Sequence, residues 1–216
     1  MSYIELENVS FNWPRGERVL AGINLEIEKQ ETLALVGANG SGKTTLARLI
    51  LGLLQPSRGR VMLEGKPVGD YTLAARGRKV GYVLQNPEQQ FFAQDSAEEI
   101  GFALRYRGYT PEQIEVRVAE MLKLFELEDY AATFPFHLSQ GEKQRLALAA
   151  VMAPGPDFLI LDEPITGLDW LRKKRLGTIL ERVRAEGIGF LLICHDREFG
   201  LGLADRQLTL EGGRLV

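Results

Sequence analysis

Apolar and polar positions alternate along much of the first 30 residues of the chain. This two-residue period is typical of strands that bury one face and expose the other. A turn at Pro14-Arg15-Gly16 separates two such stretches. We therefore expect two or three half-buried antiparallel strands, whose apolar positions are Ile4, Leu6, Val9, Phe11, Val19, Ile23, Leu25 and Ile27.

A different pattern, a short and largely apolar run, occurs four times further along the chain. These runs cover residues 33–36, 79–84, 158–161 and 188–193. Such runs are typical of strands that are covered on both faces, as in a parallel sheet flanked by helices. Helices are expected over 43–54 and 169–186, and a hairpin edge over 59–65. The alternation of strand and helix predicts an α/β fold with a mostly parallel core sheet and an N-terminal antiparallel β subdomain.

Helical periodicity dominates the middle of the chain, from about residue 95 to about residue 153. One helix is expected to begin at Pro111 after Thr110, because threonine is a favoured N-cap and proline a favoured first helical residue. Its apolar stripe is formed by Ile114, Val118, Met121, Leu122 and Phe125. We expect a single domain over residues 1–216, with a helical subdomain at about 95–153 inserted between strands of the core sheet.

Composition excludes some classes of protein. The chain has 26 Lys and Arg against 29 Asp and Glu, a net charge of −3, which argues against a nucleic-acid-binding protein. The only cysteine, Cys194, excludes an internal disulfide and fits a reducing compartment. The chain starts without the pattern of a signal peptide and contains no apolar run of membrane-spanning length. These features predict a protein of the cytoplasm.

One glycine-rich segment matches the phosphate-loop pattern of glycine, four residues, glycine, lysine and then serine or threonine. It lies between a predicted buried strand and a predicted helix, where converging backbone N–H groups and the helix dipole favour phosphate. We expect Lys43 to contact the β and γ phosphates of a nucleotide, and the Thr44 hydroxyl to bind Mg²⁺. A turn that merely joins strand and helix is the alternative. The segment consists of Gly37, Ala38, Asn39, Gly40, Ser41, Gly42, Lys43, Thr44 and Thr45.

Two carboxylates, Asp162 and Glu163, follow the buried run at 158–161. Asp162 is expected to hold Mg²⁺, directly or through water. Glu163 lies one residue further on, where a carboxylate can accept a proton from the water that attacks the γ phosphate. In isolation, an acidic pair of this kind can also cap a helix, but its combination with a phosphate loop favours the nucleotide site.

The segment Leu138-Ser139-Gln140-Gly141-Glu142 resembles the signature motif of ATP-binding cassette (ABC) ATPases, usually Leu-Ser-Gly-Gly-Gln. Further short elements match that family in order along nearly the whole chain. They are Trp13 (A-loop), Gln85 (Q-loop), Thr166-Gly167-Leu168-Asp169 (D-loop) and His195 (H-loop). The resemblance implies a P-loop NTPase fold and an ATPase that uses ATP and Mg²⁺.

The resemblance also implies roles for these residues. Ser139 and Gly141 would face the γ phosphate of ATP bound to a second cassette, with Asp169 beside them, so that a homodimer or heterodimer is the functional unit. Gln85 would sense Mg²⁺ and the attacking water, and His195 would contact the γ phosphate and position the water or Glu163. These roles would make Glu163, His195 and Gln85 catalytic residues.

Two aromatic features have a structural alternative as well as the implied role. Trp13 would stack on the adenine ring, or it closes the edge of the N-terminal sheet. Phe91 and Phe92 would form an apolar anchor for a helix of a membrane partner, or they pack in the core of the helical insert. His137 has no expected role, and Cys194 is expected to pack as a small apolar residue.

The chain departs from the family pattern at two signature positions, where Gln140 replaces glycine and Glu142 replaces glutamine. Gly141, which must approach the phosphate closely, is kept. We therefore expect hydrolysis to be retained, at an equal or slower rate. Gln140→Gly is expected to raise turnover or leave it unchanged.

The segment from Gln85 to Phe92 is similar to one in the energy-coupling factor importers, which take up vitamins or cobalt and nickel ions. This resemblance implies an ATPase subunit bound peripherally to an integral membrane transporter subunit at the cytoplasmic face of the cell membrane. One alternative is a soluble cassette that acts as a conformational switch on a cytoplasmic partner. Another is a cassette that does not hydrolyse ATP and pairs with an active one. The transported substrate is not encoded in these motifs.

Overall fold

A four-stranded antiparallel sheet forms the N-terminal part of the fold. The computed structural model describes residues 2–14, 16 and 18–216. The strands are β1 (Ile4–Asn12), β2 (Arg18–Ile27), β4 (Arg58–Leu63) and β5 (Lys66–Pro67), in the order β2-β1-β4-β5. The alternation of buried and exposed positions along β1 confirms the predicted half-buried strand. The predicted turn includes Arg15, which lies outside the described residues, but the Gly16 N–H does donate to the Trp13 carbonyl over 2.9 Å.

A six-stranded sheet forms the centre of the molecule, in the order β10-β9-β3-β8-β7-β6. Its strands are β3 (Thr32–Val36), β6 (Val80–Val83), β7 (Phe158–Asp162), β8 (Gly189–Cys194), β9 (Arg206–Glu211) and β10 (Arg214–Leu215). All neighbours are parallel except β10 and β9, which confirms the predicted mostly parallel sheet. The four largely apolar runs supply β3, β6, β7 and β8, whereas β9 and β10 were not expected from the sequence.

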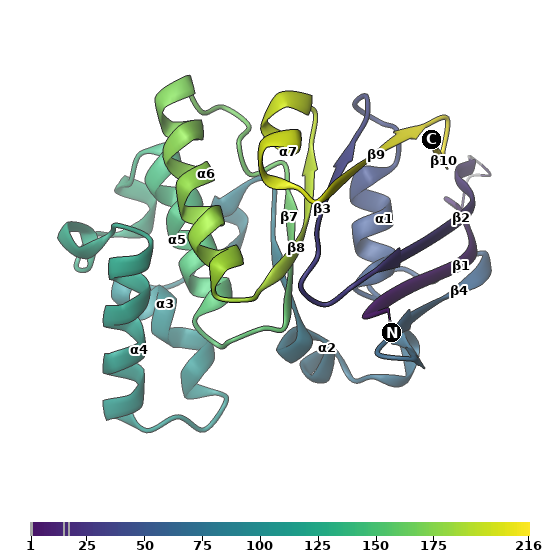
Figure 1. Ribbon diagram of the computed structural model, residues 1–216. Helices are drawn as coiled ribbons and strands as arrows, with labels where there is room; N and C mark the ends of the chain where they lie inside the picture. The colour runs from purple at the N-terminus through teal and green to yellow at the C-terminus, as the bar shows by residue number, and fades with distance from the viewer. Residues whose placement is uncertain (1, 15, 17) are drawn as a thin grey trace.

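Both faces of the central sheet are buried, because successive side chains of a strand point to opposite faces. Leu33 and Leu35 pack in a core shared with the antiparallel sheet, whereas Val36 packs in a core shared with the helical part. Figure 1 shows helix α1 (Lys43–Ile50) between the two sheets. The expected helix over 43–54 is four residues too long, because the chain leaves the helix at Gly52, whose φ is +62°.

The predicted helical segment contains three α-helices and two short 3₁₀ helices, and a third 3₁₀ helix, η2, lies just before it. The elements are η2 (Pro87–Gln90), α3 (Ser96–Arg105), α4 (Pro111–Leu124), η3 (Glu128–Tyr130), η4 (Pro135–His137) and α5 (Gln140–Met152). Helix α4 begins at Pro111 after Thr110, as expected, and the Thr110 and Gln113 side chains cap its first turn reciprocally. Figure 1 shows α3, α4 and α5 at the end of the molecule opposite to β1, β2 and β4.

The remaining helices cover the faces and edges of the central sheet. They are η1 (Val68–Asp70), α2 (Leu73–Lys79), α6 (Trp170–Ala185) and α7 (Arg197–Leu203). Asp169 caps α6, since its carboxylate accepts from the Arg172 N–H, and this places the helix within the expected range. None of the helices in the described part of the chain has both the length and the apolar character needed to cross a bilayer.

Candidate nucleotide-binding site

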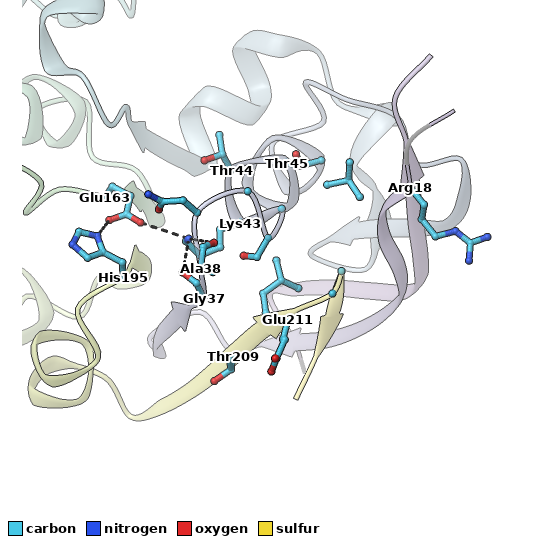
Figure 2. Close-up of a pocket in the computed structure, with 18 of the residues that line it drawn as sticks. Arg18, Gly37, Ala38, Lys43, Thr44, Thr45, Glu163, His195, Thr209 and Glu211 are labelled. Atoms are coloured by element: carbon cyan, nitrogen blue, oxygen red, sulfur yellow. Dashed lines mark hydrogen bonds and ion pairs between the residues drawn. The ribbon is translucent and has the colours of Figure 1, made fainter. Parts of the chain in front are cut away.

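A cavity of about 1220 Å³ lies at the ends of β3, β7 and β8, between the two sheets. Its residues come from segments that are far apart in the sequence, and Figure 2 shows Lys43, Glu163 and His195 turned toward one another beside Gly37 and Ala38. Most of its lining residues were expected from the sequence. They are the whole phosphate loop with Trp13, Gln85, Glu163 and His195. The sequence analysis missed the β9–β10 hairpin and the start of β2, because no local motif marks them. The missed lining consists of Arg18, Val19, Arg197, Thr209, Leu210, Glu211, Gly212 and Gly213.

The phosphate loop has the backbone geometry of an anion cradle. Gly40 and Gly42 have φ values of +80° and +107°, which only glycine adopts readily. A side chain at Gly37 would place its Cβ 2.4 Å from the Leu210 carbonyl oxygen, so this position tolerates no side chain. The Ser41 hydroxyl is buried without a hydrogen-bond partner among the described residues. A buried donor of this kind, next to the N-terminus of α1, fits a phosphate group.

Lys43 is the first residue of α1, and its ammonium group lies in the loop rather than in solvent. Nζ donates to the carbonyl oxygens of Gly37 over 2.8 Å and Ala38 over 3.2 Å. It also lies 3.7 Å from Oε1 of Glu163, and the Lys43 side chain is only 6% exposed. The loop therefore holds a positive charge at its centre, where the β and γ phosphates of ATP were expected to bind.

Asp162, at the end of β7, is held by two hydroxyl groups. The Thr44 hydroxyl donates to Oδ1 over 3.2 Å, and the Tyr82 hydroxyl donates to Oδ2 over 3.0 Å. Burial raises the pKa of the Asp162 carboxyl, and these two hydrogen bonds oppose that rise. An oriented carboxylate beside a threonine hydroxyl is a donor set that fits Mg²⁺. The sequence analysis missed Tyr82, although its place on β6, beside β7, is the signal that could have suggested it.

Glu163 and His195 form a pair at the mouth of this cavity. Nδ1 of His195 lies 2.8 Å from Oε2 of Glu163, and the Thr166 hydroxyl donates to the same oxygen over 3.4 Å. Glu163 has a φ of +52°, a strained value for a residue with a side chain, and its N–H is bonded to the Ile193 carbonyl. Strain of this kind persists where the surrounding fold holds a side chain in place. Here the fold holds the Glu163 carboxylate between Lys43 and His195.

Cys194, next to His195, is fully buried and its thiol donates to the Asp196 carbonyl over 3.3 Å. Burial raises the pKa of this thiol to about 12. The expected role as a small packing residue fits this environment.

Trp13 and Gln85 both line the cavity and both are exposed. The indole of Trp13 is 38% exposed and packs edge-on against Phe11, with ring centroids 5.1 Å apart. An aromatic face is therefore available to stack on a base, while the ring also covers Phe11 at the edge of the sheet. Both interpretations offered for Trp13 have support in this geometry.

Ser139, Gly141 and Asp169 lie away from this cavity. Ser139 and Gly141 line a second cavity of about 620 Å³ between α5 and α6. Gly141 is packed closely by the Arg172 side chain, and Arg172 also pairs with Asp169 over 2.8 Å. Within one chain, the expected site residues therefore form two groups that lie apart from each other.

The two departures in the signature segment lie in the first turn of α5. Gln140 is the first residue of the helix and is exposed. The Glu142 carboxylate accepts from the Ser139 N–H over 2.8 Å, which satisfies one of the free donors at the helix start. Glutamate therefore serves here as a capping residue.

The expectation of an apolar anchor at Phe91 and Phe92 is wrong for Phe91. This ring is only 8% exposed and packs edge-on against Phe136 in the core of the helical part. Phe92 is 61% exposed and contacts Phe102, with ring centroids 4.2 Å apart. His137 is exposed and packs edge-on against Phe134.

Comparisons with known proteins identify the family of the chain. The family model described as ABC transporter matches residues 20–166. The energy-coupling factor transporter ATP-binding protein EcfA of Methanothermobacter thermautotrophicus is 38% identical over 216 residues, which cover 99% of this chain and 69% of that protein. The chain spans between 35% and 81% of the length of the curated relatives that it matches.

Two solved structures have the same fold. CbiO1 from Clostridium perfringens, part of the ABC transporter complex CbiONQ, has a TM-score of 0.93 at 30% identity, over 100% of this chain and 87% of that one. The dimeric ATP-binding cassette MJ0796, in a post-hydrolysis state with ADP and phosphate bound, has a TM-score of 0.88 at 27% identity, over 98% of this chain and 96% of that one. The chain therefore belongs to the ABC transporter family, as one of its ATPase subunits.

Proposed function

We propose that this chain powers a membrane importer of the energy-coupling factor type, which takes up a vitamin or a transition-metal ion. The observation that carries the proposal is the Glu163 carboxylate, fixed between Lys43 and His195 at the mouth of a phosphate-binding cavity. Its arrangement supports hydrolysis rather than nucleotide binding alone. Similarity to EcfA and CbiO1 supports the importer type.

Within the cavity, each side chain has a proposed task. The phosphate loop and Lys43 bind the phosphates of ATP, and Trp13 stacks on the adenine ring. Thr44, Gln85 and Asp162 would hold Mg²⁺, which supplies positive charge to the phosphate groups when bound.

For the chemical step, we propose that Glu163 accepts the proton of the attacking water. His195 holds Glu163 in position through the contact at 2.8 Å, and it is exposed enough to reach the γ phosphate. Glu163, His195 and Gln85 are thus the proposed catalytic residues.

Two cassettes, in a homodimer or heterodimer, are proposed to close on ATP. Ser139 and Gly141, with Asp169 nearby, would contact the nucleotide held by the partner cassette. Their separation from the cavity around Lys43 supports this arrangement, since Ser139 and Gly141 line a second cavity that shares no lining residue with the first. The whole of residues 1–216 acts as one ATPase domain in this proposal, with the helical part as its insert.

The membrane partner is proposed to be a separate integral membrane subunit at the cytoplasmic face. The exposed Phe92 ring and the half-buried Phe102 ring that it contacts, on the helical part, offer it an apolar contact. Nothing in the charge balance of the chain favours nucleic acid as a partner.

Glu163→Gln tests the enzymatic part of the proposal. Loss of the proton acceptor should lower phosphate release by about 10²- to 10⁴-fold. The variant should still bind ATP and should accumulate as an ATP-dependent dimer, measured by light scattering after size exclusion. Glu181→Gln, on the exposed face of α6, is the matched control. Turnover at the wild-type rate in Glu163→Gln would contradict the assignment of Glu163.

Co-purification from membranes tests the transport part. The tagged chain should bring down a protein with several membrane spans, and Phe92→Asp should weaken that association. Recovery with soluble proteins alone would instead support the conformational-switch alternative. A chain that binds ATP without releasing phosphate, alone or with its partners, would support the non-hydrolysing alternative.

A further inference from the structure

The short 3₁₀ helix η2 lies between the two groups of site residues. It begins two residues after Gln85, which lines the nucleotide cavity, and it packs on α5, the helix that Ser139 and Gly141 begin. Its N-cap is the Asn86 side chain, which accepts from the Glu88 N–H over 3.2 Å. This element therefore joins the segment of Gln85 to α5 by direct contact.

One end of η2 is bonded to the central sheet. The Gln90 side chain accepts from the Leu84 N–H over 2.8 Å and donates to the Tyr82 carbonyl over 3.2 Å. Both partners lie at the end of β6, next to Gln85. The chain that leaves η2 is held as well, because the Glu99 carboxylate accepts from the N–H groups of Phe92 and Ala93 over 2.9 and 2.8 Å.

The contact from η2 to α5 is an ion pair. Nζ of Lys143, in the first turn of α5, lies 2.6 Å from Oε1 of Glu88. The Lys143 side chain is 11% exposed and the Glu88 side chain 40% exposed. The Lys143 charge is largely withdrawn from water, so it depends on the Glu88 carboxylate. Removal of Glu88 would leave that buried charge without a compensating partner.

We infer that the Glu88–Lys143 ion pair is a positioning contact that links Gln85 in the nucleotide cavity to the Ser139–Gly141 surface. It sets the position of α5 relative to the end of β6, so that a change at Gln85 on nucleotide binding is passed to the start of α5. The inference rests on the proposed closure of two cassettes, because it assigns the contact to the step that prepares α5 for the partner's nucleotide. Glu88 and Lys143 act through other residues and need not touch ATP.

The test uses the full chain in a Glu163→Gln background, where bound ATP is retained. Glu88→Gln keeps the size and a hydrogen-bond acceptor, and Lys143→Met keeps the apolar stem. Each should raise the ATP concentration for half-maximal dimer formation about tenfold, a typical coupling between two sites. The Kd for ADP, which reports the nucleotide cavity of one chain, should stay within about twofold, below the size of any such coupling.

A charge reversal separates positioning from general stability. The double variant Glu88→Lys with Lys143→Glu should restore the half-maximal ATP concentration to within about threefold of the parent, since the pair re-forms. Glu120→Gln, which breaks the Arg117–Glu120 pair on α4, is the matched control and should change neither quantity. Thermal unfolding of every variant accompanies the titrations.

The outcomes distinguish failure of the inference from failure of the proposed closure of two cassettes. A parent that stays monomeric at saturating ATP overturns the proposed closure, and the inference falls with it. A parent that dimerises while the single variants match it overturns the inference alone. Single variants that lose dimer formation and thermal stability together, without recovery in the reversed pair, show a structural contact only and also overturn it.

Discussion

The phosphate loop and the start of α5 both present helix N-termini suited to anions, yet they are built differently. Around Lys43, polar groups from the loop, β7 and the segment after β8 lie close together and form hydrogen bonds with one another. At α5, the Ser139 N–H is bonded to Glu142 of the same helix, and the surrounding cavity is lined only by α5, α6 and the residue Leu168 before α6. The first site gathers residues from many segments of the chain, whereas the second lies between two helices.

From this difference we expect nucleotide binding and nucleotide turnover to depend on separate regions of the molecule. Substitutions around Lys43 should change the affinity of one chain for nucleotide. Substitutions at the start of α5 should leave that affinity intact and change only the steps that need a second cassette.

Among the substitutions that test this difference, the largest effect is expected for Lys43→Ala, in the cavity around the phosphate loop. Removal of a charged donor from the centre of the phosphate loop should weaken ADP binding by about 2 kcal/mol, or roughly thirtyfold in Kd. Titration calorimetry on the purified chain measures this change. Lys66→Ala, an exposed lysine on β5, supplies the control and should bind ADP like the wild type. Tight binding by Lys43→Ala would remove the lysine from the site.

Ser139→Ala should show the opposite division of effects. Its Kd for ADP should match the wild type, while turnover should fall about tenfold through loss of one hydrogen bond to a charged phosphate. Steady-state phosphate release and ADP titration measure the two quantities. Ser139→Thr, which keeps the hydroxyl, should retain most of the turnover. An equal loss of ADP affinity in Ser139→Ala would mean that the two regions are not independent.

The architecture of the central sheet was predictable where strands are apolar on both faces. The runs that form β3, β7 and β8 are largely apolar, as expected of strands in a sheet that is covered on both faces. Strand β9 was missed because Arg206, Gln207 and Thr209 interrupt its apolar positions. Its place beside β3 depends on parallel pairing between Leu33–Val36 and Arg206–Thr209, a long-range contact that local sequence does not encode.

The site was predictable where its chemistry is local. The phosphate loop and Asp162-Glu163 are short motifs in which neighbouring residues act together. Tyr82 was missed because it reaches Asp162 across adjacent strands, and the two are 80 residues apart in sequence. The separation of Ser139 from the cavity of Lys43 followed from the family resemblance, and no local pattern in the chain indicates it.

Glu99 holds the chain between the two regions through hydrogen bonds from the Phe92 and Ala93 N–H groups. Burial raises the pKa of this carboxyl above its usual value, against two opposing backbone hydrogen bonds. The folded state therefore holds the proton to higher pH than the unfolded state. The stability that Glu99 contributes is greatest below its ordinary pKa and declines as pH rises through the raised value.

Glu99→Gln should remove this pH dependence while keeping an acceptor for the Phe92 and Ala93 N–H groups. The free energy of unfolding of the wild type, minus that of the variant, should fall with rising pH above the usual range of a glutamate. Urea unfolding at a series of pH values measures the difference. Glu98→Gln, a neighbouring exposed carboxylate whose pKa is lowered by the Gln94 N–H and by Arg105, should give the opposite slope. A flat difference for Glu99→Gln would contradict the assigned burial effect.

The smallest effect is expected for Gln140→Gly, which restores the usual signature residue at the start of α5. Glycine at the first position of α5 should cost less than about 1 kcal/mol of stability, because Gln140 is exposed and lies at the helix end. The smaller residue also clears the approach to Gly141, so turnover should stay equal or rise by up to about threefold, less than one full hydrogen bond is worth. Phosphate release and thermal unfolding, measured on the same preparation, separate the two effects. A large loss of turnover at unchanged stability would show that the Gln140 amide itself takes part, and the departure at this position would then be a functional feature of the second site.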